Sequence, residues 1–252
     1  MKTKSAILIV LLAILFAMVM TGPVIAGPGG KIATAAFKTF WGRVFLLCLT
    51  VFFLPLIVYS KIKLRMSEKR ALKDLRFVSS FDSRFEWTTT KERVIDCFNR
   101  VHDAWQRESV ETLSEWMIDW YIQNQQMLFL DKWKKQGLKN HCEVGRFVRI
   151  RPVLFVHRND GAPHEGSKLV VAITAKLKDY LINRDTDQIV EGYPDFQNVR
   201  TVWSFTLMNG NWKVSNIEES LSVHDYVDLR SELPKIEQTI TNNHFQDSKD
   251  AP

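Results

Sequence analysis

The chain has 252 residues, of which 46% are hydrophobic and 25% charged, and its formal net charge is +6. This length accommodates one ordinary domain with additional segments. Three cysteines are too few for a disulfide framework or a zinc site, and they are consistent with a reducing compartment.

The positive charge is concentrated near the N-terminus. Residues 1–76 contain 12 of the 34 Lys and Arg residues and two of the 28 acidic residues, which leaves 22 basic and 26 acidic residues, net −4, for residues 77–252. A nucleic-acid-binding protein is expected to carry its basic patch on the folded domain. The distribution therefore argues against a nucleic-acid partner.

Residues 1–26 have the pattern of a targeting segment. Lys2 and Lys4 precede an uncharged apolar run, and Val24 and Ala26 are placed as in a small-residue cleavage site. The pattern predicts either a signal peptide that is removed or a signal anchor that is retained, and both alternatives stay open.

A second apolar run covers residues 40–60, with Arg43 as its only charge. At 1.5 Å per residue it would be about 30 Å long as a helix, which is the thickness of a hydrocarbon core. Trp41 and Tyr59 lie near its ends, where amphipathic rings favour the membrane interface, and Pro55 would kink a span without preventing it. We therefore predict a transmembrane helix over 40–60 rather than a buried core helix.

Basic residues crowd the far side of this span, in a segment that we interpret as a juxtamembrane linker over 61–90: Lys61, Lys63, Arg65, Lys69, Arg70, Lys73 and Arg76. Because cytoplasmic flanks carry the Lys and Arg excess, the remaining chain is predicted to be cytoplasmic. A rival topology, in which the second run does not span and the domain is exported, stays open. The cluster could bind anionic phospholipid at about 1 kcal/mol per residue, or it could serve only to set topology.

The next two segments show a helical period. Residues 91–107 place apolar side chains at three- and four-residue steps after a capping Thr89 or Thr90, and residues 110–136 repeat the signal up to Gly137. We expect two amphipathic helices.

After Gly137 the period becomes alternating, which predicts strands. The first, over 143–159, is expected to place Val148, Ile150, Leu154 and Val156 on one face, with an edge position or a bulge at Pro152. One more strand is predicted after the first, and two further strands are predicted on either side of an Asn209-Gly210 turn. The residues expected to point inward from these strands are Leu169, Val171, Ile173, Ala175, Leu177, Trp203, Phe205, Leu207, Trp212, Val214 and Ile217. Helices followed by strands indicate the α+β class.

Four acids lie between the second and third long strands: Asp179, Asp185, Asp187 and Glu191. The spacing from Asn183 imitates a calcium loop, but Gln188 replaces the required glycine and Pro194 replaces the closing glutamate. We therefore predict a hairpin turn over 183–188, with Asp179 left as a candidate acid or base.

Other chemical motifs are absent from the sequence. Residues 161–168 resemble a phosphate-binding loop, but Ser167 precedes Lys168 instead of following it, and the loop joins two strands. The six histidines show no paired ligand spacing. We predict no catalytic residue, no metal site and no cofactor.

Several stretches carry a resemblance to a known family: F-x-x-V-x-x-A-W at 98–105, A-K-L-K-D-Y at 175–180, V-E-G-Y at 190–193, and V-W-S-F-T-L with W-K-V-S-N-I within 202–217. Over residues 91–220 the chain resembles the C-terminal domain of the 44-kDa subunit of the mitochondrial inner-membrane translocase. Bacterial membrane-anchored proteins and a mitochondrial large-subunit ribosomal protein share that domain.

The resemblance implies helices packed on a curved antiparallel sheet, in a cone related to nuclear transport factor two, with an apolar pocket between them. It also implies a non-catalytic, membrane-associated adaptor that contacts lipid and tethers a protein partner, in protein translocation or membrane-protein biogenesis. The second apolar span, and the lack of the subunit's long chaperone-binding region, favour a bacterial inner-membrane protein. Residues 221–252 are expected to form an extension with a disordered tail after Gln238.

The alternative function is a small-molecule-binding protein or an isomerase- or hydratase-type enzyme that uses the pocket, with Asp179, Tyr180 or His102 as acid or base. The partner and the oligomeric state are not predicted. The residues expected to line the pocket or the core are Phe98, Val101, Trp105, Met117, Trp120, Ile173, Trp203 and Phe205.

Overall fold

The computed structural model describes residues 40–219, 223–230 and 232–240 of the chain. The chain divides into two compact units, residues 1–62 and residues 63–252. Helix α3 (Phe40–Ser79) contributes to both units. The predicted signal segment 1–26 and residues 241–252 of the predicted tail lie outside the described residues. The prediction of disorder directly after Gln238 is wrong for residues 239 and 240, which are helical, and Ile240 packs against the domain core.

The first half of α3 is a candidate membrane-spanning helix, as predicted. It is long and apolar enough to cross a bilayer, and the first buried side chain along α3 is that of Ser67. Pro55 lies inside the helix without ending it.

The second half of α3 belongs to the folded domain, where the sequence had indicated a linker over 61–90. The helix continues to Ser79, and Ala71, Leu75 and Val78 are buried in the domain core. These residues follow a spacing of four and three, which places them on one helical face among the basic residues. The Ser67 hydroxyl donates a 2.6 Å hydrogen bond to the Val153 carbonyl, which fixes this half against the sheet.

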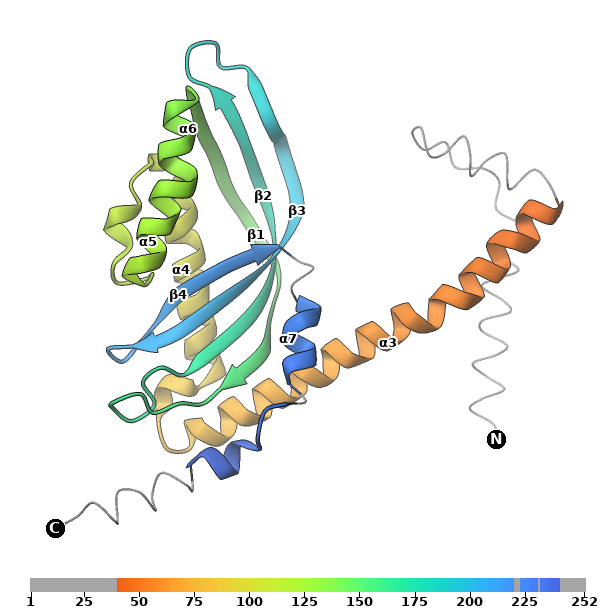
Figure 1. The fold of residues 1–252 in the computed structure, drawn as a ribbon, viewed down its shortest axis with the longest axis vertical. Coiled ribbons are helices and arrows are strands. Elements are labelled where there is room, and N and C mark those ends of the chain that lie inside the picture. Colours follow the sequence, from red (N-terminus) through yellow and green to blue (C-terminus); the bar gives the residue numbers. More distant parts are fainter. Residues whose placement is uncertain (1–39, 220–222, 231, 241–252) are drawn as a thin grey trace. The chain divides into compact units, whose positions relative to one another are not determined.

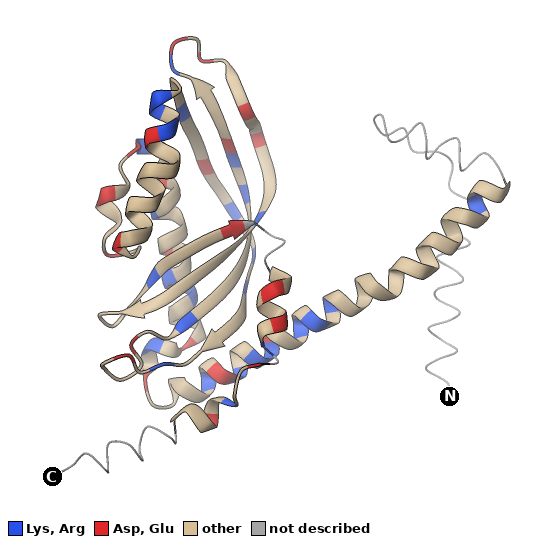
Figure 2. Cartoon of the chain, viewed as in Figure 1, with Lys and Arg blue, Asp and Glu red and all other residues tan. Residues whose placement is uncertain are grey.

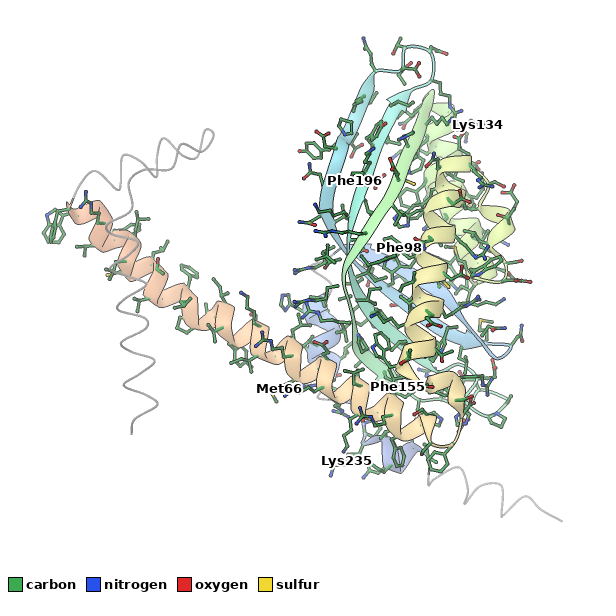
Figure 3. All side chains as sticks on the ribbon, turned by 180° about the vertical axis from the view of Figure 1, so that it is seen from behind. Met66, Phe98, Lys134, Phe155, Phe196 and Lys235 are labelled. Atoms are coloured by element: carbon green, nitrogen blue, oxygen red, sulfur yellow. The ribbon has the colours of Figure 1, made fainter. Side chains whose placement is uncertain are left out.

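Helix α4 (Trp87–Arg107) begins four residues earlier than expected, after the short helix η1 (Ser83–Phe85). Thr90 therefore does not cap the helix, and its hydroxyl donates instead to the Arg84 carbonyl at 3.1 Å. Phe98 points from α4 towards the sheet and contacts Trp203, with ring centroids 4.9 Å apart (Figure 3).

The expected helix over 110–136 is interrupted. It consists of η2 (Val110–Leu113), a turn at 114–116, α5 (Asp119–Gln125), the π-helical turn η3 (Gln126–Leu130) and α6 (Asp131–Lys135). The interruption occurs where Met117 pairs in parallel with Val214 of the sheet. Helical periodicity cannot show this pairing, because both residues are simply apolar.

Four antiparallel strands form one sheet in chain order: β1 (Leu138–Val156), β2 (Lys168–Asn183), β3 (Ile189–Met208) and β4 (Asn211–Glu219). The sheet is strongly curved, and α4 to α6 cover one face (Figure 1). The α+β class with helices on a curved antiparallel sheet is therefore confirmed. The predicted turns at 183–188 and at Asn209-Gly210 are also present, the latter with φ of 52° and 75°.

Strand β1 departs from simple alternation. Register shifts lie between Val144 and Phe147 and again next to Pro152, as that proline suggested. As a result Val148 is 51% exposed, and Ile150 and Leu154 pack in different clusters instead of sharing one face.

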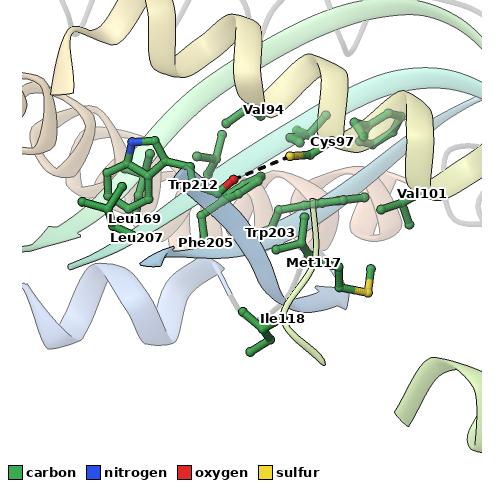
Figure 4. Close-up of a cluster of buried hydrophobic side chains, with 14 of the residues drawn as sticks. Val94, Cys97, Val101, Met117, Ile118, Leu169, Trp203, Phe205, Leu207 and Trp212 are labelled. Atoms are coloured by element: carbon green, nitrogen blue, oxygen red, sulfur yellow. Dashed lines mark hydrogen bonds between the residues drawn. The ribbon is translucent and has the colours of Figure 1, made fainter. Parts of the chain in front are cut away.

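Two apolar clusters hold the domain together. The larger joins α3, α4, η2 and the sheet face beneath them, and Figure 4 shows its centre around Trp203 and Phe205. The smaller lies on the opposite face, where α7 (Val223–Leu229) places Val223 and Val227 against Val170 and Val202. Part of the predicted C-terminal extension therefore packs on the sheet.

Candidate functional site

A cavity of about 500 Å³ opens between the helices and one part of the sheet. We call this part the open half; it comprises residues 138–144, 179–183 and 189–198, where β3 pairs with β2 but not with β4. The helices contribute Trp105, Gln125, Leu128, Phe129, Lys132 and Trp133. The strands of the open half contribute Asn140, Asp179, Tyr180, Leu181, Glu191 and Gly192, and β4 contributes Ile217. A volume of this size suits a small molecule or a side chain of a partner.

The π-helical turn shapes the helical wall of the cavity. The Asp131 amide bonds the Gln126 carbonyl five residues earlier, and the Gln126 side-chain amide donates to the Asp131 carboxylate at 2.7 Å. The turn places Phe129 and Trp133 on the wall, with ring centroids 5.7 Å apart. Such turns are frequent at functional sites, because the extra residue redirects the side chains around it.

The strand wall follows from the register. Asn140 lies opposite Leu181, and Leu181 lies opposite Glu191, so these three side chains share the face that lines the cavity. Gly192 has φ +88°, and a Cβ there would lie 2.3 Å from the Asp179 carbonyl oxygen. Only glycine therefore allows β3 to approach β2 at this point.

Asp179 is the lining residue with a perturbed pKa. Its side chain is reached by solvent through the cavity, but protein atoms surround it on most sides, and this partial burial raises its pKa. A hydrogen bond with Asn140 acts in the opposite direction, while the nearby charge of Glu191 raises the pKa further. The cavity therefore holds two acids, and the charge of Glu191 acts on Asp179.

The predicted lining residues separate into three groups. Trp105 lines the cavity. Trp120 is 58% exposed, because the helix restarts at Asp119 and turns Tyr121 inward in its place. The other six are buried in the larger apolar cluster: Phe98, Val101, Met117, Ile173, Trp203 and Phe205.

The other candidates for acid or base chemistry differ in position. His102 is buried in the core, where desolvation lowers its pKa to about 4, and its Nδ1 lies 2.8 Å from the Phe98 carbonyl oxygen. It does not line the cavity. Tyr180 does, next to Asp179.

The predicted basic cluster also separates. Arg70 donates to the carbonyls of Arg230, Leu233 and Pro234, and Lys63 and Lys73 form ion pairs with Asp228 and Glu237. The remaining four are solvent-exposed: Lys61, Arg65, Lys69 and Arg76. Figure 2 shows in blue the positions of basic residues along α3. The C-terminal extension therefore engages three of the seven.

One pair of histidines was missed by the sequence reasoning. His157 Nε2 lies 2.9 Å from His164 Nδ1 across the loop between β1 and β2, and His164 also contacts the Phe85 ring. Burial lowers the pKa of both rings. Their spacing fits no ligand motif, and the available signal was that His157 lies near the end of the first predicted strand and His164 inside the loop over 161–168 that follows it.

The sequence profile described as Tim44-like domain matches residues 73–219 of the chain. Among solved structures, the chain is similar to the crystal structure of the intermembrane space region of the chloroplast protein ARC6. That similarity has a TM-score of 0.36 and 12% sequence identity, and it covers 52% of this chain and 95% of that chain. No curated protein matches the sequence.

Proposed function

Because the chain belongs to the Tim44-like domain family, we propose that it is a membrane-anchored, non-catalytic adaptor that holds a protein partner at the cavity. Domains of this family are associated with protein-translocation scaffolds and interact with proteins and membranes. The proposed process is protein translocation or membrane-protein biogenesis at a bacterial inner membrane.

The observation that supports a docking role is the apolar rim of the cavity. Met127 and Leu128 on η3 are 68% and 55% exposed, and Val190 and Tyr193 on β3 are 57% and 69% exposed. Contiguous apolar and aromatic side chains around a concavity are typical of protein interaction sites. Leu128 itself lines the cavity, and Met127, Val190 and Tyr193 are each next in sequence to a lining residue.

Site-specific photo-crosslinking in membranes tests this role. A photoreactive residue at Met127 and another at Tyr193 should crosslink the same protein, since one partner must touch both walls. A third at Asn211, the first residue of β4, is the control. Equal crosslinking from Asn211, or different proteins from the two walls, would contradict docking at the cavity.

The proposed side of the membrane rests on the basic residues that follow the span. Cys97 and Cys142 are buried, and burial raises the pKa of each thiol to about 12, so only Cys48 must be replaced before labelling. An Asp185→Cys chain should then react with an impermeant reagent in inverted vesicles and not in intact cells. Labelling after permeabilisation of the outer membrane alone would indicate an exported domain.

Lipid contact is proposed for the exposed basic residues of α3. Replacing Arg65, Lys69 and Arg76 with glutamine in a 63–252 fragment should weaken binding to anionic vesicles by about 100-fold, at roughly 1 kcal/mol per charge. The matched control replaces three exposed lysines outside α3: Lys134, Lys135 and Lys139. If both variants lose vesicle binding equally, the effect depends on net charge alone and the basic residues of α3 form no specific lipid contact.

A second candidate function is a pocket enzyme of isomerase or hydratase type. The observation that favours it is the pair of neighbouring acids in the cavity, with the pKa of Asp179 raised. An enzyme of this kind should lose at least about 100-fold in kcat in an Asp179→Asn variant. An adaptor has no turnover to lose.

A further inference from the structure

The charges that line the cavity are unbalanced. Two carboxylates, Asp179 and Glu191, face it from adjacent strands, and Lys132 is the single cationic residue of its lining. Within the described residues, neither carboxylate forms an ion pair with a Lys, Arg or His side chain. Lys132 is itself solvent-exposed, so its ammonium group can remain in water.

The cavity also contains polar groups without partners. Gln125 is only 4% exposed and lines the cavity, and no side-chain hydrogen bond joins it to any part of the chain that the structure describes. The indole Nε1 of Trp105, another lining residue, is buried and lacks a hydrogen-bond partner in the same part of the chain. The amide oxygen of Gln125 can therefore accept a hydrogen bond from an ammonium group, whereas the indole N–H of Trp105 is itself a donor and would need an acceptor.

Aromatic rings form the opposite wall. Trp105, Phe129 and Trp133 line the cavity from three helical segments, across from the two carboxylates. Aromatic faces attract cations through their quadrupole, and tryptophan does so most strongly. An aromatic wall facing paired carboxylates is therefore complementary to an organic cation with an apolar body.

We propose that the cavity binds an alkylammonium group, with Asp179 and Glu191 as its anionic partners and the aromatic wall around its carbon chain. The group could belong to a free amine or to a lysine side chain of a protein partner. A neutral apolar ligand would desolvate both carboxylates without compensation, and an anionic ligand would be repelled. This inference goes beyond the proposed function, because a free amine would bind whether or not a protein docks at the rim.

Isothermal titration calorimetry on the full chain in phosphatidylcholine nanodiscs tests the proposal. Cadaverine is the cationic probe, and 1,5-pentanediol is its neutral counterpart of similar length. We expect cadaverine to bind and the diol to show no saturable binding at the same concentrations. Equal binding of the two, or no binding of any amine probe, would overturn the proposal.

Matched variants locate the site. Asp179→Asn with Glu191→Gln should weaken cadaverine binding at least 10-fold, whereas Asp185→Asn with Asp187→Asn, the same charge change in the exposed turn, should change it less than twofold. Equal weakening in both pairs would show a diffuse charge effect and would refute the cavity site. The wild-type comparison of amine with diol stays decisive even if one variant folds poorly.

Peptides distinguish the two sources of the ammonium group. A short acetylated peptide with one central lysine is compared with its norleucine version and with cadaverine. Preference for the lysine peptide over cadaverine assigns the site to a partner's side chain, and preference for cadaverine assigns it to a free amine. Crosslinking at the rim can fail while amine binding succeeds, so the failure of either proposal is recognisable separately.

Discussion

The two halves of the sheet use the same strands for different purposes. Where β4 pairs with β3, at residues 201–208, the side chains of Val202, Trp203, Phe205 and Leu207 are fully buried. In the open half, no strand among the described residues lies beyond β3, and residues 189–198 are all exposed. One part of β3 therefore lies in a close-packed core, and another part of the same strand lies beside an open cavity.

This difference shows how a small domain can combine stability with an accessible site. Burial of large side chains supplies the stability in the half that β4 completes. The open half forgoes that burial and keeps polar and aromatic groups in contact with solvent. Mutations in the two halves should consequently differ in the size, and in one case the sign, of their effect on stability.

The largest expected effect is in the packed half. Phe205→Ala should lower the free energy of unfolding by about 3–5 kcal/mol, because it removes a fully buried ring and leaves a cavity. Phe129→Ala, at a ring that is 40% exposed, should cost less than about 1.5 kcal/mol. Urea unfolding of residues 63–252 measures both, and similar losses would remove the distinction between the halves.

Acid should destabilise the packed half through His102. Its pKa of about 4 in the fold lies below the ordinary 6.5, so the unfolded chain binds the proton more tightly. The stability that His102 contributes is present above pH 6.5 and is lost as the pH falls towards 4, by about 3 kcal/mol at 1.36 kcal/mol per pH unit. His102→Leu should reduce the pH dependence of the free energy of unfolding in urea by this amount. An unchanged pH profile would show that a group other than His102 takes up the proton.

Two glycines test the close approach of β3 to β2. Gly192→Ala should cost roughly 2–3 kcal/mol, because its Cβ would meet the Asp179 carbonyl in addition to the strain of a positive φ. Gly137 also has a positive φ, +68°, but nothing lies within 4 Å of a Cβ there. Gly137→Ala should therefore cost only about 1 kcal/mol. Equal thermal shifts in the two variants would show that contact with Asp179 is unimportant.

The smallest effect has the opposite sign. The pKa of Asp179 is raised in the fold, so ionisation of this group at neutral pH opposes folding. Asp179→Asn should raise the free energy of unfolding at pH 7, by less than about 1 kcal/mol because solvent reaches the carboxylate. The gain should vanish at pH 3, where the native carboxyl is protonated. A loss of stability at pH 7 would mean that the charge is favourably paired.

Much of the fold follows from local sequence patterns. The apolar face of α4, the alternation in β2 and the Asn209-Gly210 turn each depend on neighbouring residues alone, and each lies where the sequence predicted it. The helical second half of α3 was hidden because its apolar stripe is narrow and lies among seven basic residues. A packed helix with a charged exposed side has the composition of a linker.

The candidate site was less accessible to prediction. Asp179 was noticed as an acid near a strand end, but Glu191, Gln125 and Trp133 meet it only through the register of β3 and the π-helical turn. Neither the register shifts of β2 and β3 nor an extra residue in a helix leaves a periodic trace in one sequence. The cavity forms through pairing between residues that are distant in the sequence. For this reason, the spacing of residues along the chain does not predict which polar side chains line it.

The π-helical turn at 126–130 contains one residue more than a regular α-helical turn. Deleting one residue there would restore a regular helix, and everything after it would rotate by about 100° around the axis. Trp133 would then leave the cavity while Gln125 and the strands stayed in place. The recognition surface of this domain thus depends on residue count as well as residue identity, and a relative that is one residue shorter in this helix would present a different wall.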